Sequence, residues 1–128
     1  MKSFRKSFVF NSPAEDIYAC LTNPRTIELW SGCKAVMPDK PGGEFSWFDG
    51  DISGLFTEAV PNRSVRFEWH FGDELPVSPV IITLSEQGGV TKVLVEQERI
   101  PDEDFDNITD GWESVVAEGI RMFLNPNF

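Results

Sequence analysis

The feature that most constrains the fold is a strict alternation of apolar and polar residues from residue 65 to residue 71. The apolar members are Val65, Phe67, Trp69 and Phe71, and the polar members between them are Arg66, Glu68 and His70. Successive side chains of a strand point to opposite faces, so the pattern predicts a strand with one buried face and one solvent face. Such a sheet needs another layer on its apolar face.

Further segments show strand patterns separated by turn residues. They are residues 4–10, 34–37, 45–47, 52–60, 79–85 and 91–100. The glycine-rich connection Glu86–Gly89 predicts a hairpin between the last two. Strands that follow one another through short turns favour an antiparallel sheet.

Two short helices are predicted after the first strand. Ser12 and Glu15 have the spacing of a capping box, with Pro13 at the first helical position. Asn23 and Pro24 repeat the start signal for a second helix that ends near Trp30.

A long helix is predicted after Pro101, with Asn125–Pro126 ending it. Its apolar stripe is expected at Ile108, Trp112, Val115, Val116, Gly119, Ile120 and Phe123. A lone amphipathic helix must bury its stripe against the sheet. The sequence therefore predicts one α+β domain over residues 1–128, with a curved antiparallel sheet wrapped around the C-terminal helix.

The charge of the chain limits its partners. Eleven Lys and Arg against 21 Asp and Glu give a formal net charge of −10. Such a surface repels phosphate backbones and anionic lipid, so neither nucleic acid nor a membrane surface is expected as a partner. No apolar run has the length of a membrane span, and the first residues lack the pattern of a signal peptide. The cytoplasm is the expected compartment.

Several site chemistries are excluded by residue type and spacing. His70 is the only histidine, which rules out a histidine-dependent triad and a multi-histidine metal site. Cys20 and Cys33 show no ligand pattern and are expected as free thiols. The acidic run that starts at Asp102 lacks the glycine and terminal glutamate of a calcium loop. No cofactor and no metal are expected.

The order of segments resembles the helix-grip fold of the START and birch-pollen-allergen superfamily. The similarity is closer to its branch of homologues of the activator of the heat-shock-chaperone ATPase, in their bacterial single-domain form. The matching stretches are residues 10–14, 21–24, 42–45, 54–61, 65–69, 91–93 and 111–112, together with Trp30. The resemblance implies the fold over nearly the whole chain. Two positions depart from the pattern of this family: Gln97 where a histidine is frequent, and Gly119 where a leucine is usual.

The resemblance also implies an interior cavity between sheet and helix, because a sheet curved around a helix often encloses one. The residues expected to line it are Trp30, Phe45, Trp47, Phe56, Phe67, Trp69, Phe71, Gln97, Trp112, Val116, Gly119 and Phe123. Pockets are mostly apolar with few polar groups, and a buried Trp needs a partner for its N–H. The alternative is that the same rings fill the core.

Three residues have two interpretations each. Gln97 is either a hydrogen-bonding group inside the cavity or a rim residue, and Glu58 is either a buried general base or an ordinary surface charge. Gly119 either marks a close approach of the helix to the sheet or opens volume in the interior.

The leading hypothesis is that this protein binds a small apolar or amphipathic molecule in its interior. The first alternative is a chaperone-accessory or other interaction protein, against which the lack of a second domain argues. The second is a cyclase-type or hydrolase-type enzyme that uses the same cavity, with Glu58 or Gln97 in a catalytic role. A homodimer is compatible with all three.

Overall fold

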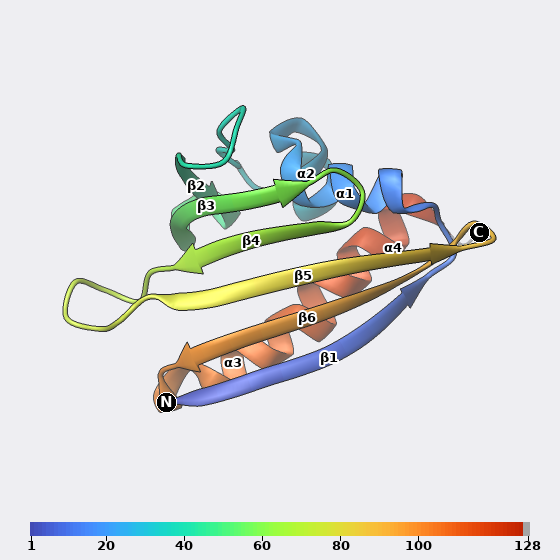
Figure 1. The fold of residues 1–128 in the computed structure, drawn as a ribbon. Helices are drawn as coiled ribbons and strands as arrows, with labels where there is room; N and C mark the ends of the chain where they lie inside the picture. Colours follow the sequence, from blue (N-terminus) through green and yellow to red (C-terminus); the bar gives the residue numbers. More distant parts are fainter. Residues whose placement is uncertain (127–128) are drawn as a thin grey trace.

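The computed structural model describes residues 1–126 and consists of one sheet, two short helices and a C-terminal helical segment (Figure 1). The strands are β1 (Lys2–Phe10), β2 (Glu44–Trp47), β3 (Ile52–Val60), β4 (Ser64–Trp69), β5 (Ser78–Gln87) and β6 (Val90–Ile100). The helices are α1 (Ala14–Thr22), α2 (Pro24–Ser31), α3 (Phe105–Asp110) and α4 (Glu118–Leu124), with a π-helical stretch, Gly111–Ala117, between α3 and α4. We call Phe105–Leu124 the C-terminal helix.

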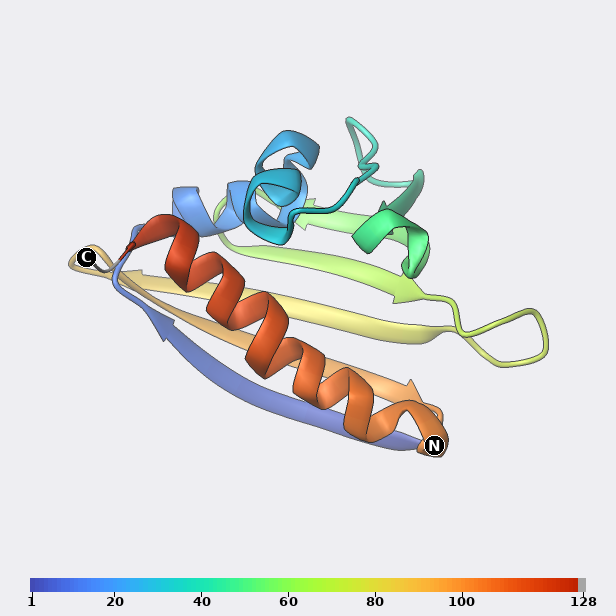
Figure 2. The ribbon, with the colours of Figure 1, turned by 180° about the vertical axis from the view of Figure 1, so that it is seen from behind.

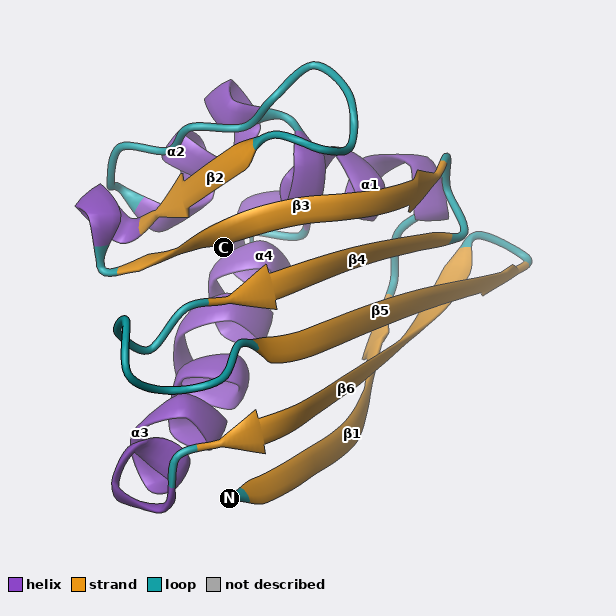
Figure 3. Cartoon of the chain, turned by 60° about the vertical axis from the view of Figure 1, so that its left-hand side comes forward, coloured by secondary structure: helices purple, strands orange, loops and turns teal. Residues whose placement is uncertain are grey.

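The six strands form one antiparallel sheet in the order β1-β6-β5-β4-β3-β2 (Figure 3). Strands β2 to β6 lie side by side in their sequence order. Strand β1 pairs with β6 and not with β2. The C-terminal helix crosses one face of this curved sheet diagonally, and α1 and α2 lie on the same side of the sheet, next to α4 (Figure 2). The predicted α+β class and the helix-grip arrangement are confirmed.

Both predicted helices form, and the start signal predicted for the second one is confirmed. The Asn23 side chain accepts hydrogen bonds from the backbone N–H groups of Arg25 and Thr26 at 3.0 and 3.2 Å, and Pro24 opens α2. The capping box predicted at Ser12 is wrong. Glu86 instead accepts the hydrogen bond from the Ala14 N–H at 2.7 Å, because the hairpin turn after β5 lies beside the start of α1.

Two predicted strand boundaries are also wrong. The segment 34–37 forms only an isolated bridge between Val36 and Ser46, because the chain enters and leaves it through turns. Strand β4 ends at Trp69, opposite Ser78, so Phe71 lies beyond the last paired residue and is half-buried.

The π-helical stretch changes which face of the C-terminal helix is buried. A π-helix bonds each residue to the fifth one along, which rotates the residues that follow relative to an α-helix. Trp112, Val116, Ala117 and Ile120 are buried, while Val115 and Phe123 are 48% and 37% exposed. The predicted stripe was therefore correct for Trp112, Val116 and Ile120 and wrong for Val115 and Phe123.

Candidate functional site

The space between sheet and C-terminal helix holds a layer of aromatic side chains. Trp69 on β4 stacks on Trp112 of the helix, with ring centroids 5.2 Å apart and planes at 19°. Trp47 meets Trp69 edge-on at 6.3 Å and Phe67 at 5.3 Å. Such pairs add stability beyond the area they bury. The layer fixes the helix to the sheet.

A buried chain of hydrogen bonds lies beside this layer and joins β5 and β6 to the helix. Trp112 Nε1 donates to Gln97 Oε1 at 2.8 Å, and Gln97 Nε2 donates to Ser78 Oγ at 3.1 Å. Ser78 Oγ in turn donates to the backbone carbonyl of Glu98. Gln97 and Ser78 have no exposed area. Gln97 therefore lies in the interior and is not a rim residue.

The four indole N–H groups differ in their partners. Trp30 donates to the Cys20 carbonyl at 2.8 Å, Trp47 to the Met37 sulfur at 3.4 Å, and Trp112 to Gln97. Trp69 Nε1 is buried and has no partner among residues 1–126, and no other buried side-chain nitrogen or oxygen there lacks one.

The interior of the described residues holds one small cavity under the C-terminal helix. The cavity under the C-terminal helix measures about 20 Å³, which holds at most about one water molecule. It is lined by Phe8, Phe10, Ile17, Leu21, Ile82, Val93, Val95, Trp112, Val116, Ala117 and Ile120. A wall of this kind has no polar group to hold a water. Of the residues expected to line a ligand cavity, only Trp112 and Val116 border it.

The remaining expected residues divide by burial. Nine of the twelve are buried: Trp30, Phe45, Trp47, Phe56, Phe67, Trp69, Gln97, Trp112 and Val116. Gly119 and Phe71 are half-buried, and Phe123 is exposed. The structure therefore brings most of them into one core, and the cavity beside that core in the described residues measures only about 20 Å³.

Gly119 marks a close approach between helices. A Cβ at this position would lie 2.9 Å from Cε3 of Trp30, so the Trp30 ring occupies the space that a side chain would need. A close approach is therefore present, but its partner is α2 and not the sheet, so the predicted partner was wrong. The Trp30 ring fills this space, and the glycine does not open volume there.

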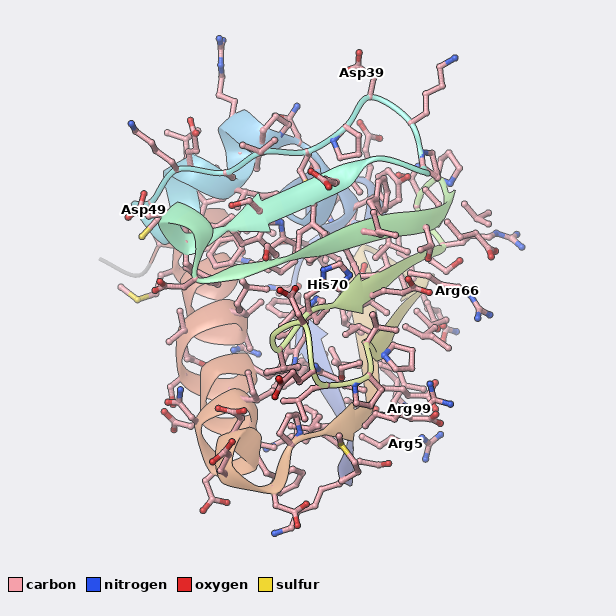
Figure 4. The ribbon with its side chains drawn as sticks, turned by 90° about the vertical axis from the view of Figure 1, so that its left-hand side faces the viewer. Arg5, Asp39, Asp49, Arg66, His70 and Arg99 are labelled. Atoms are coloured by element: carbon pink, nitrogen blue, oxygen red, sulfur yellow. The ribbon has the colours of Figure 1, made fainter. Side chains whose placement is uncertain are left out.

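Glu58 and His70 lie outside the interior. A bulge after Phe56 shifts the register of β3, so Glu58 lies opposite Arg66 and forms an exposed ion pair with it at 3.6 Å. Its carboxylate is a surface charge. His70 is exposed at the end of β4, and Arg5, Arg66 and Arg99 point away from the C-terminal helix (Figure 4). No charged group is buried in the described part of the chain.

The two cysteines are free thiols, as expected. Burial raises the pKa of the Cys20 thiol to about 12, and the Asp16 carboxylate adds to the rise. The pKa of Cys33 is also raised, by desolvation and then by Asp49. Neither thiol is an activated nucleophile, because the thiolate is the reactive form.

An exposed groove that sequence reasoning missed lies where the ends of β1 and α4 meet the β5–β6 turn. Its lining residues are Val9, Asn11, Val90, Glu118, Arg121, Met122, Asn125 and Pro126. Met122 and Val9 are 71% and 56% exposed. Met122 is a large apolar residue outside the apolar stripe predicted for the C-terminal helix, and this was the signal available in the sequence. We call this the terminal groove.

Two negative findings apply to residues 1–126. They contain no group of three or more His, Cys, Asp or Glu side chains placed to hold a metal ion. None of their helices has the length and apolarity that a membrane crossing requires.

The curved sheet, the two short helices and the C-terminal helix across the sheet define the helix-grip class of protein. Within it, the family model described as "Activator of Hsp90 ATPase homolog 1-like protein" matches residues 11–124. The chain belongs to this family.

Among curated proteins, the chain is similar to the human activator of 90 kDa heat shock protein ATPase homolog 1. The two are 26% identical over 115 residues, which is 88% of this chain and 34% of the relative. A homologue from Dictyostelium discoideum is 24% identical over 94% of the chain and 32% of its own length. The chain thus spans about a third of the length of these relatives.

Solved structures agree on the fold. An HSP90 activator from Plasmodium falciparum is 26% identical, with a TM-score of 0.89 over 97% of this chain and 96% of that one. The Aha1 dimer from Colwellia psychrerythraea is 16% identical, with a TM-score of 0.80 over 98% of each chain. This second likeness concerns the fold alone.

Proposed function

We propose that this chain is an accessory protein that binds a chaperone of the Hsp90 type through its surface. The observation that supports this choice over an interior binder is the filled core: the aromatic layer leaves only about 20 Å³ beneath the C-terminal helix. Catalysis in the interior would require polar side chains that converge on a substrate. Gln97 instead forms hydrogen bonds with both Ser78 and Trp112. The surface, by contrast, exposes large apolar side chains such as Met122.

The terminal groove is the proposed contact. Met122 and Val9 leave apolar area exposed, and exposed apolar patches on folded proteins mark interaction sites. Arg121 lies at the same place, where it donates to the Val9 carbonyl at 3.0 Å and pairs with Glu118 at 2.6 Å. An apolar centre with a charged rim is the usual composition of a protein interface.

The family resemblance supports the class of partner. The human relative and the Plasmodium structure are both described as activators of the 90 kDa chaperone. The Plasmodium chain matches this one over nearly its full length, which weakens the argument that a second domain is needed for such a role.

The test is ATP hydrolysis by the host's Hsp90-type chaperone, measured with and without this chain. We expect the chain to raise the rate, and Met122→Glu to remove the effect because a charge in the contact must be desolvated. Val36→Glu is the matched control, since Val36 is 60% exposed and lies beside the opposite edge strand, β2. An unchanged rate, together with no complex by native mass spectrometry, contradicts the proposal.

A second candidate, binding of a small apolar molecule, is supported by one observation, the unpartnered Trp69 N–H. Binding there would require the aromatic layer to open. Cyclase or hydrolase activity has no comparable support, because the Glu58 carboxylate lies on the surface.

A further inference from the structure

The C-terminal helix carries exposed apolar side chains in addition to the ones that it buries against the sheet. Val115, Met122 and Phe123 have exposed fractions of 48%, 71% and 37%. No described element lies over the outer side of this helix, which is the side nearest the viewer in Figure 2. Val115 and Phe123 are eight positions apart, so these side chains extend over roughly 12 Å, about two helical turns. Exposed apolar patches on folded proteins mark contact surfaces, and we call this one the helix patch.

Acidic side chains precede and flank the helix patch along the helix. Residues 102–124 contain seven acidic residues and one basic residue. Asp106 and Asp110 are exposed and form no ion pair within residues 1–126. Glu113 and Glu118 do form ion pairs, but their partners are partly exposed cations, and such pairs are weak. The surface around the helix patch is therefore strongly negative.

This charge decides what can cover the helix patch. A second copy of the chain, related by two-fold symmetry, would bring the same patch and the same negative charge, so repulsion opposes self-association there. Nucleic acid and anionic lipid are repelled for the same reason. A basic segment is attracted instead. An amphipathic helix can lay its apolar face on a patch of two turns while its cations meet the acidic side chains.

We propose that the outer face of the C-terminal helix binds a basic amphipathic helix of a partner protein. The apolar side chains of that helix cover the helix patch, and its Lys or Arg side chains pair with Asp106, Asp110 and Glu118. The inference rests on the proposed function and deepens it, because Glu118 and Met122 belong to both the terminal groove and this face. It adds the charge and the secondary structure of the segment that the partner contributes.

The probe is a synthetic peptide of Lys and Leu, about 14 residues or four helical turns long, with its Leu residues on one face. Two control peptides keep this length: one has Gln in place of Leu and lacks the apolar face, and the other has Glu in place of Lys. Nitrogen-15 amide spectra of the full chain locate the binding, and titration gives the Kd. We expect the Lys–Leu peptide to shift the amide signals of residues 106–123. The Lys–Gln peptide should bind about tenfold more weakly, because no apolar area is buried, and the Glu–Leu peptide should shift none of these signals.

Charge reversals at matched positions test the location. Asp106→Lys combined with Asp110→Lys removes two acidic groups beside the helix patch and should weaken binding of the Lys–Leu peptide about tenfold. Glu44→Lys combined with Glu98→Lys makes the same change in net charge on the other face of the sheet, where both residues are exposed and adjoin buried ones. This control should weaken binding by less than about threefold, because salt screens distant charges.

The outcomes distinguish this inference from the proposed function. Equal weakening by the two pairs of charge reversals would mean attraction to the net charge only and would overturn the site. Equal Kd values for the Lys–Leu and Lys–Gln peptides, or shifts confined to residues outside the C-terminal helix, would also overturn it. A chain that raises the ATPase rate of the chaperone but binds no peptide would contradict this inference alone. Peptide binding at the helix patch by a chain that neither binds the chaperone nor changes its rate would contradict the proposed function alone.

Discussion

Single residues decide how closely the C-terminal helix can approach its neighbours. Gly119 could be recognised from the sequence as an unusual residue in a helix, but two explanations remained. The choice between them depended on Trp30, which lies far from Gly119 in the sequence and 2.9 Å from the position of its absent Cβ. The direction of the Glu58 side chain could not be predicted from the sequence either. The bulge that turns it to the surface is not visible in the alternation of apolar and polar residues along β3.

Two glycines of the C-terminal helix give a matched prediction. We expect Gly119→Ala to lower the free energy of unfolding by about 1–3 kcal/mol, because Trp30 must shift. A Cβ at Gly111 would meet no atom within 4 Å. Gly111→Ala should therefore raise the free energy of unfolding by up to ~1 kcal/mol, because alanine has the higher helix propensity. Urea unfolding of both variants measures the difference. Equal effects of the two substitutions would contradict the close approach.

Cys20 predicts a pH dependence. The thiol has an ordinary pKa of 9.0 in the unfolded chain and about 12 in the folded protein, so the unfolded chain loses its proton first as pH rises. The free energy of unfolding should fall between pH 9 and 12 by at most about 1.4 kcal/mol per pH unit from this group. Cys20→Ala should show a shallower fall than the wild type in urea unfolding across this range. Parallel curves would show that the thiol does not contribute.

At the scale of elements, the strands were the most predictable part. Alternation in β4, β5 and β6 follows directly from one buried and one exposed face. The C-terminal helix was predicted as an element but not in its phase, because it contains a π-helical stretch in which Trp112 contacts Trp69 and Gln97. Those contacts come from different strands, and no local pattern encodes them.

The hydrogen bonds of Gln97 should matter for the docking of the helix on the sheet. Gln97→Leu would leave a second buried indole N–H, that of Trp112, without an acceptor. We expect a loss of about 1–3 kcal/mol in the free energy of unfolding, with faster solvent exchange of the Trp112 indole proton. Ser78→Ala keeps the Trp112–Gln97 bond and should leave that exchange rate near the wild-type value. Unchanged exchange in Gln97→Leu would show that the bond does not hold the helix.

For the whole molecule, the dominant property is its charge. The described ion pairs all join exposed or partly exposed groups, which contribute little. A net charge of −10 repels itself. The net charge follows directly from the sequence. The terminal groove could be found only in the structure, because Val9, Val90 and Met122 come from separate elements.

We therefore expect added salt to raise the melting temperature, measured by circular dichroism at low ionic strength and in about 0.5 M NaCl. Glu103→Lys, which alters an exposed residue in the acidic approach to α3, should raise it at low salt and less at high salt. A melting temperature that falls with salt would show that the ion pairs outweigh the repulsion.

The pairing of β1 with β6 also bears on how the protein is made. A ribosome releases the chain from its N-terminal side, so Lys2–Phe10 leaves the exit tunnel long before Val90–Ile100, the strand that pairs with it. During that interval β1 has no hydrogen-bonding partner, and an unpaired strand invites contact with other chains. Lys2, Arg5 and Lys6 give the waiting segment a positive charge that opposes pairing with its own copies on neighbouring ribosomes.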